Sequence, residues 1–275
     1  MPEKYTTPYP AKRIYSDDRS EDIEVLLAKE CPVKLFLNGK IFTTLFASPL
    51  ELKELAVGHL ITEGIVSFRE IENIEVEGST VHVRTRKESQ DIYAETFGEV
   101  EEVEEVEEVE EVEEVEEVEE VEEVGKAGKK EKASREIFVD SDSIFESQVV
   151  FAGTEYLESD TYKLTRGTHL AALIDRSGKL AVQIVDVGRH NAVDKAVGAA
   201  FLKGLDLSQH YMLSTGRQPA YMVIKAARAG IPLIATKSMP FDSGVEAAKK
   251  ANVCLIGQLR KESMLIFASE WRVKF

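Results

Sequence analysis

The stretch that decides the fold is Val185-Asp186-Val187-Gly188-Arg189-His190-Asn191-Ala192-Val193-Asp194-Lys195. Residues 180–185 before it are apolar and rich in β-branched side chains, which is typical of a buried strand. From Val193 onward, apolar residues recur at the i, i+3, i+4, i+7 spacing of an amphipathic helix. The pattern therefore predicts a strand-to-helix turn at Gly188. Free backbone N–H groups, the helix dipole and Arg189 would together favour an anion at this turn.

Two further turns of the same kind follow, at Ser214-Thr215-Gly216-Arg217 and Thr236-Lys237-Ser238. Predicted strands at 211–214, 232–236, 253–258 and 264–268 alternate with predicted helices that begin near 189, 219 and 241. Such alternation predicts an α/β domain with a largely parallel sheet that is covered on both faces. Ligands bind beyond the carboxyl ends of such strands, so two arginines and a lysine would meet there and suit a phosphorylated ligand. The alternative is that glycine and serine serve only the turns.

The N-terminal half shows a different pattern. Residues 1–30 are polar and are predicted to form a loosely held arm, followed by a hairpin of 33–37 and 41–45 around Asn38-Gly39. Ser48-Pro49 is predicted to cap a helix that ends at Gly64, and a strand pair follows at 71–76 and 81–85. Further along, residues 141–143 are predicted to cap a helix that runs to about 157, and a hairpin to join 170–175 with 180–187.

The charge of the chain is concentrated in one tract. The 275 residues carry a net charge of −16, but residues 99–124 hold 17 glutamates and no lysine or arginine, so the remainder is nearly neutral. The tract repeats Val-Glu-Glu with a period of three, which matches neither a helix nor a strand. We therefore expect three parts: an N-terminal α+β domain at 1–98, a low-complexity acidic linker at 99–135 and a C-terminal α/β domain at 136–275.

Composition and missing motifs exclude several classes of protein. The chain is not basic enough for nucleic acid to be its main partner, and no apolar run has the length of a membrane span, so we expect a cytoplasmic protein. The sequence has no P-loop, no GxGxxG fingerprint and no zinc deaminase pattern. His59 and Glu63 lie one turn apart without a third ligand nearby, so no metal site is expected. Cys31 lies beside Pro32 at the start of a predicted strand and Cys254 lies within an apolar predicted strand, so both are expected to be inert thiols.

The chain resembles the formate dehydrogenase accessory proteins, which are sulfurtransferases of the FdhD type. The motifs that carry the resemblance are residues 55–65, 167–172, 186–195, 214–217 with 221–226, and 229–232. The resemblance implies a three-layer α/β/α domain similar to cytidine deaminase but without zinc, preceded by a smaller N-terminal domain. It also implies sulfur transfer from a cysteine desulfurase to the molybdenum of a bis-molybdopterin guanine dinucleotide cofactor, which the protein binds. The implied partners are the desulfurase, the catalytic subunit of formate dehydrogenase and a second copy of the chain.

The turns and the resemblance together give the candidate cofactor-binding residues, while no catalytic residue is assigned. These candidates are Thr168, His169, Asp186, Gly188, Arg189, His190, Asn191, Lys195, Ser214, Thr215, Gly216, Arg217, Thr236, Lys237, Ser238, Gln258, Leu259, Arg260, Lys261, Glu262 and Ser263. Thr168 and His169 precede their strand, so they are expected to reach the site only by packing across it.

One departure from the family pattern leaves two functions open. Such proteins usually carry sulfur on a Cys-x-x-Cys loop between the two domains, but no cysteine lies between Cys31 and Cys254 here. The chain is therefore either a sulfurtransferase that uses another thiol or a cofactor-binding chaperone that transfers no sulfur. A hydrolase or deaminase acting on a nucleotide is disfavoured, because no pair of nucleophile and base and no metal set is visible.

Overall fold

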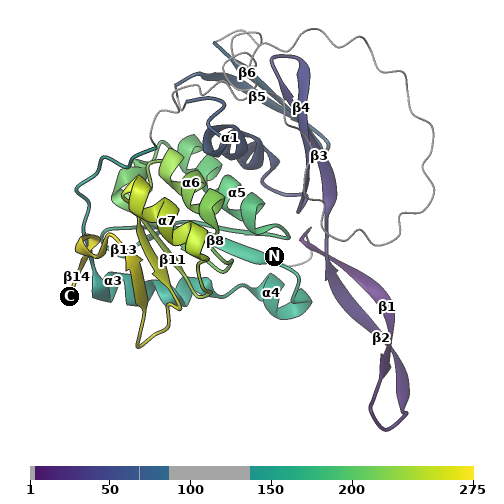
Figure 1. The fold of residues 1–275 in the computed structure, drawn as a ribbon. Helices are drawn as coiled ribbons and strands as arrows, with labels where there is room; N and C mark the ends of the chain where they lie inside the picture. The colour runs from purple at the N-terminus through teal and green to yellow at the C-terminus, as the bar shows by residue number, and fades with distance from the viewer. Residues whose placement is uncertain (1–3, 68, 87–136) are drawn as a thin grey trace, which may run out of the picture.

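The computed structural model describes residues 4–67, 69–86 and 137–275 (Figure 1). The predicted acidic linker at 99–135 lies outside these residues, as do the two domain boundaries predicted at its ends. Among the described residues, no helix is both long enough and apolar enough to cross a lipid bilayer.

A six-stranded sheet forms the centre of the C-terminal part, in the order β13-β12-β11-β10-β8-β9. Its strands are β8 (His169–Asp175), β9 (Leu180–Asp186), β10 (His210–Ser214), β11 (Leu233–Thr236), β12 (Cys254–Gly257) and β13 (Leu265–Ala268). Only the pairs β10–β11 and β11–β12 are parallel, and the other three pairs of neighbouring strands are antiparallel, so the prediction of a largely parallel sheet is wrong. The reason is that β8 and β9, and also β12 and β13, are joined by connections too short for a parallel crossover.

Both faces of this sheet are buried, because alternate side chains of each strand enter opposite cores. One core contains Leu173, Met212 and Ile234, and the other contains Leu170, Leu213 and Ala235. The first face is covered by α5 (Arg189–Leu202), α6 (Ala220–Arg228) and α7 (Asp242–Ala251). The second is covered by α3 (Ser147–Ala152), the 3-10 helix η2 (Gly153–Leu157) and α4 (Asp160–Thr165) (Figure 1).

The N-terminal part contains the two predicted strand pairs and the predicted helix, and its four strands form one sheet. Its elements are β3 (Cys31–Leu37), β4 (Lys40–Ala47), α1 (Leu52–Thr62), β5 (Ile71–Glu77) and β6 (Thr80–Thr85), with the sheet order β4-β3-β6-β5. Asn38 and Gly39 have φ values of 49° and 84°, which suits the predicted two-residue hairpin. The prediction that Ser48 caps α1 is wrong. Glu51 precedes the helix, and the Ser48 hydroxyl instead accepts a hydrogen bond from the Val187 N–H.

The two parts share one core, which joins them through α1 and α5. Side chains of β3, α1, α5 and β8 all enter the same cluster. The helices approach closely at Gly58 and Gly198, where a Cβ would overlap the backbone carbonyls of Asp194 and Glu54 respectively. Only glycine allows this approach, so the position of α1 on α5 depends on both residues.

Two predictions about irregular segments are wrong. The loose arm predicted for 1–30 is not found in the described residues 4–30, because β1 (Thr6–Ile14) and β2 (Ser20–Ala28) form an antiparallel ribbon. Residues 141–143 do not cap a helix; the chain forms β7 (Phe145–Glu146) first, and α3 begins at Ser147. The Ser143 hydroxyl instead donates to the carbonyl of Ser208, which lies within η3 (Leu207–Gln209).

The C-terminal end is fixed by a buried arginine. The chain ends in η4 (Glu270–Arg272) and β14 (Val273–Lys274), and β14 pairs with β7. The guanidinium of Arg272 is fully buried and donates to the backbone carbonyls of Val139, Ser141, Ser143 and Asn252. These bonds attach the segment before β7 to the last turn of the chain.

Candidate functional site

The sheet topology brings the three predicted turns to one edge. β9 and β10 are both antiparallel to β8, so β9 ends at the same edge as β10, β11 and β12. The turns 186–191, 214–217 and 236–238 therefore lie together with the loop 258–263. Because β8 runs in the opposite direction, Thr168 and His169 at its start also lie at this edge. We call it the carboxyl edge.

A buried ion pair supports the first turn from below. The Asp186 carboxylate accepts from the Gly188 N–H (2.8 Å) and the Asn191 amide (3.2 Å) with one oxygen. Its other oxygen accepts from the Ser48 N–H (3.1 Å) and lies 2.6 Å from Lys195 Nζ. Both charged side chains are 0% exposed. Asp186 and Lys195 therefore face each other, and they act on a ligand only through the turn that they hold.

In the next two turns, the hydroxyl groups of Ser214 and Thr236 form hydrogen bonds within the protein. Ser214 Oγ accepts from the Gly216 N–H, and Thr236 Oγ1 donates to the Gly216 carbonyl. Thr236 Oγ1 also accepts from the Ser238 N–H. These bonds fix the path of the backbone beside Arg217 and Lys237, and they leave the two cationic side chains as the groups that can meet a ligand.

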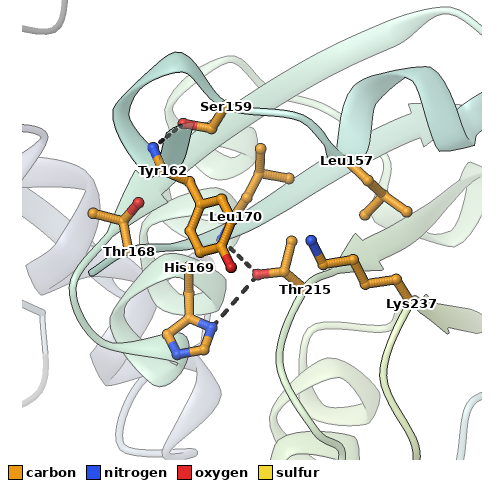
Figure 2. A pocket seen from close by; sticks show the side chains of 8 residues that line it. All are labelled: Leu157, Ser159, Tyr162, Thr168, His169, Leu170, Thr215 and Lys237. Atoms are coloured by element: carbon orange, nitrogen blue, oxygen red, sulfur yellow. Dashed lines mark hydrogen bonds between the residues drawn. The ribbon is translucent and has the colours of Figure 1, made fainter. Parts of the chain in front are cut away.

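A cavity of about 110 Å³ opens at this edge (Figure 2). Its lining residues are Leu157, Ser159, Tyr162, Thr168, His169, Leu170, Thr215 and Lys237. Thr168 is 6% exposed, and its Oγ1 has no hydrogen-bond partner among the described residues. Lys237 Nζ lies 5.2 Å from the centre of the Tyr162 ring, so a cation borders the cavity. A buried hydroxyl without a partner is rare in folded proteins, and here it lines a cavity.

The histidine of the cavity is neutral at pH 7. Burial lowers the pKa of His169, and the positive charge of Arg189 lowers it further. Thr215 Oγ1 accepts from the Leu170 N–H and lies 3.5 Å from His169 Nδ1 (Figure 2). The neutral ring and the threonine hydroxyls can donate or accept hydrogen bonds, while Lys237 supplies the charge.

A second polar cluster lies at the start of α5 and α6. The Arg189 guanidinium donates to the Tyr221 hydroxyl (3.4 Å), and the His190 ring lies 4.8 Å from the Tyr221 ring. Arg189 Nε and His190 Nε2 are buried and lack partners among the residues that the structure describes. Arg217 lies over the Phe241 ring at 5.1 Å. This cluster combines two arginines with exposed aromatic rings, which suits a ligand with phosphate groups and planar rings.

The last predicted loop completes the edge. Gln258 has a φ of 47°, and Leu259 is buried beneath the loop. Arg260 donates to the Lys237 carbonyl, while Lys261, Glu262 and Ser263 are exposed. Arg260 therefore connects this loop to the turn that carries Lys237.

Sequence reasoning missed the wall of the cavity that α4 supplies. Tyr162 belongs to this short helix, and Ser159 caps the helix by accepting from the Tyr162 N–H. The pair Ser159-Asp160 was an available signal for a helix start. Tyr221 was also missed, because an exposed aromatic residue on a helix has no signal of its own.

Neither cysteine lies in an activated environment. Burial raises the pKa of the Cys254 thiol to about 12. Burial also raises the pKa of Cys31, against the opposing effect of Lys195. Both thiols are therefore protonated at neutral pH, and a thiolate is the form that attacks sulfur.

Fold and site together define a mixed α/β protein with a small cavity bordered by Lys237, and a cluster that contains two arginines, at the carboxyl edge of its central sheet. The chain belongs to the FdhD/NarQ family, whose model matches residues 28–274. The resemblance to formate dehydrogenase accessory proteins is thereby confirmed at the level of the family.

Known relatives extend over nearly the whole chain. The chain is 28% identical over 260 residues to the sulfur carrier protein FdhD of Methanothermobacter thermautotrophicus, covering 94% of this chain and 95% of the relative. It is 26% identical over 261 residues to the sulfur carrier protein FdhD of Bacillus subtilis, with the same coverage of 94% and 95%. A crystal structure from Desulfotalea psychrophila, described as a formate dehydrogenase accessory protein, matches with a TM-score of 0.75 and 21% identity. It covers 98% of this chain and 100% of that chain, and it supports the fold.

Proposed function

We propose that this chain is an accessory protein in formate dehydrogenase maturation and that it binds a bis-molybdopterin guanine dinucleotide cofactor at the carboxyl edge. The observation that carries the proposal is that one edge of the sheet holds Lys237, Arg189 and Arg217 together with three buried polar atoms that lack partners among the described residues. The family and the names of the relatives supply the link to formate dehydrogenase.

The residues at this edge fit the chemistry of such a cofactor. Its phosphate groups are anionic, and arginine and lysine at the strand ends are suited to bind them. Lys237, Arg189 and Arg217 would hold the phosphates, while Thr168 Oγ1 would make the hydrogen bond that it lacks within the protein. Asp186 and Lys195 would hold the first turn in place. When bound, the cofactor supplies the molybdenum that would accept sulfur.

Calorimetry with GDP tests the binding proposal. Losing a charge-assisted hydrogen bond costs about 1.5–3 kcal/mol, which corresponds to roughly ten- to hundredfold in affinity. Arg189→Ala should weaken GDP binding by about this factor, and Arg189→Lys should recover only part of the loss. The midpoint of unfolding of each variant serves as the control for folding. The proposal is wrong if the parent protein binds no GDP or if Arg189→Ala binds GDP as tightly as the parent.

Sulfur transfer from a cysteine desulfurase is the second candidate function, and the name shared by the relatives favours it. It requires a thiol, and this chain offers Cys31 and Cys254. Because the pKa of both thiols is raised, we predict that neither holds a stable persulfide. Mass spectrometry after treatment with a desulfurase and cysteine tests this. Stoichiometric loading of Cys31, followed by transfer of the sulfur to the cofactor, would establish the second function.

A further inference from the structure

The ribbon of β1 and β2 extends away from the rest of the molecule (Figure 1). Its two strands pair without a register shift from Thr6 opposite Ala28 to Ile14 opposite Ser20. A two-stranded ribbon has an unpaired backbone edge on each side, and each edge can accept a further strand. The two edges of this ribbon differ in how many N–H donors they offer.

Hydrogen bonds at both ends of the ribbon show which residues have backbone groups that point outward. The Lys29 N–H donates to the Tyr5 carbonyl (2.7 Å), and the Tyr15 N–H donates to the Arg19 carbonyl (2.9 Å). Directly opposite residues of an antiparallel pair alternate between hydrogen-bonded and non-hydrogen-bonded pairs. The backbone N–H and C=O groups of odd-numbered residues therefore bond within the ribbon, and those of even-numbered residues point away from it. Pro8 is among the outward-pointing residues of β1.

The edge of β1 is therefore blocked, and the edge of β2 is open. Pro8 and Pro10 both lack an N–H, so the outer edge of β1 has lost two successive donors. The outward residues of β2 include Asp22 and Glu24, whose N–H groups are intact. Within residues 4–67, 69–86 and 137–275, neither of these two N–H groups donates a backbone hydrogen bond.

The base of β2 is covered, but its outer half is not. At the base, a Cβ on Gly167 would lie 3.7 Å from the Cβ of Ala28. Farther out, the side chain of Asp22 is 84% exposed, and Glu24 is also exposed. The open part of the edge therefore centres on residues 22–24.

The side chains of β2 alternate between the two faces of the ribbon, and Lys12 of β1 lies opposite Asp22 and forms an ion pair with it (2.7 Å). Ile23, Val25 and Leu27 share one face of β2 with Tyr9 of β1, which is 56% exposed. Asp22 and Glu24 lie on the other face. An added strand would therefore place alternate residues beside apolar and acidic neighbours.

The acidic side chains determine what the edge can bind. If β2 paired antiparallel with a second copy around residues 22–24, Asp22 or Glu24 would lie opposite another carboxylate in each register. Like charges directly opposite each other are destabilising, whereas opposite charges are stabilising. We propose that the open edge of β2 around Asp22–Glu24 binds an extended segment of another protein in which apolar and basic residues alternate. Backbone hydrogen bonds would hold this segment, and lysine or arginine opposite Glu24 would select it, while Asp22 would share its charge with Lys12 of β1.

A nine-residue peptide of alternating valine and lysine, with blocked termini, is the probe. Amide hydrogen exchange of the full chain should be slowed at Asp22 and Glu24 on binding, while amides of β1 should not change. Glu24→Pro removes one outward N–H without touching the bonds inside the ribbon, and it should weaken binding about tenfold. Ile14→Pro is the matched control on the edge of β1, since Ile14 also has an outward N–H and carries no charge, and it should leave the affinity of the peptide unchanged.

Two further measurements separate the alternatives. A peptide with glutamate in place of lysine should not bind, and Glu24→Lys should weaken binding of the lysine peptide most at low salt. If the lysine peptide protects neither Asp22 nor Glu24, the acidic edge serves only to repel other strands, and the proposal is overturned. If the free protein is a dimer in which these two amides are already protected, a second copy is the occupant and the proposal is overturned as well.

Discussion

The two ends of the central sheet are built from similar turns, but they differ in whether the polar atoms of these turns have hydrogen-bond partners within the protein. At the end opposite the carboxyl edge, Asp175 accepts from the Ser177 N–H (2.8 Å), the Ser177 hydroxyl (2.6 Å) and the Lys179 N–H (3.0 Å). Asp206 accepts in the same way from the N–H and hydroxyl of Ser208. The carboxylates of these turns thus receive hydrogen bonds from their own turns and need no ligand to supply them.

The carboxyl edge is different, because some of its polar atoms have no partner within the protein. Four buried side-chain atoms without a partner occur among the described residues, and three of them lie at this edge: Thr168 Oγ1, Arg189 Nε and His190 Nε2. Buried polar atoms are normally paired, so a cluster of unpaired ones needs an explanation. A ligand that supplies the missing partners explains it, and a turn that serves only the fold does not.

The largest expected difference between the two ends is in stability. Asp186→Asn leaves the Lys195 charge buried without its partner, which should cost about 3–5 kcal/mol of unfolding free energy. Asp175→Asn at the opposite end removes only a charge and weakens exposed hydrogen bonds within a turn, so it should cost about 1 kcal/mol or less. Urea denaturation of both variants measures the difference.

A double variant separates the charge from the packing. Asp186→Asn combined with Lys195→Met removes both charges, so it should be more stable than Asp186→Asn alone. If Asp175→Asn proves as destabilising as Asp186→Asn, the buried pair does not have the structural role assigned to it.

The next largest effect concerns ligand affinity. Lys237→Met should weaken GDP binding about ten- to hundredfold, because the ammonium group borders the cavity. Lys203→Met is the matched control, since Lys203 Nζ is exposed and donates to the Ala181 carbonyl near the opposite end of the sheet. Calorimetry of both variants decides the matter, and equal losses in both would show that the effect is one of overall charge.

The smallest effect is a difference in response to acid. The pKa of His169 is lowered by burial and by Arg189, so its protonation disfavours the folded state. The stability that its neutral form contributes is present above the unfolded pKa of about 6.5 and is lost as pH falls through the lower folded pKa. His169→Gln should flatten this part of the stability profile by a small amount.

Asp175 responds in a separate pH range. Its pKa is lowered chiefly by the hydrogen bond from the Ser177 hydroxyl, so its contribution is present above about pH 3.9 and is lost as pH falls below that. In urea titrations between pH 7 and pH 3, the unfolding free energy should therefore first lose the contribution of His169 and only at lower pH that of Asp175. A profile that His169→Gln leaves unchanged down to pH 5 would contradict this order.

The sequence predicted most elements of the C-terminal part because their signals are local. The apolar strand before Asp186 and the helical spacing after Val193 agree with β9 and α5. The relative direction of strands that are distant in the sequence could not be read from local sequence patterns. Whether β8 lies antiparallel to β10 depends on the short hairpin at residues 176–179 and on how β8 packs, which strand periodicity does not encode.

The candidate site was predicted in position but not in the roles of its residues. Asp186, Arg189 and Lys195 lie within one short motif, yet Arg189 is half-exposed while the other two are fully buried. Burial of this kind depends on contact with Ser48, which lies far away in the sequence. For the same reason Tyr162 was missed as a wall of the cavity.

The N-terminal ribbon was missed because its sequence is polar and carries two prolines. Prolines normally argue against a strand, but Pro8 and Pro10 both occupy positions whose backbone points away from β2. The spacing of two residues between them is compatible with an edge strand. An isolated ribbon has little core to reveal it in the pattern of hydrophobicity.

Hydrogen exchange with and without GDP tests the central claim most directly, because it compares the two ends of the sheet in one experiment. We predict that GDP slows exchange at residues 159–169, 186–191, 214–217 and 236–238, and that it leaves the turns at 175–179 and 206–209 unchanged. Protection of the turns at 175–179 and 206–209, or no protection at the carboxyl edge at saturating GDP, would contradict the account.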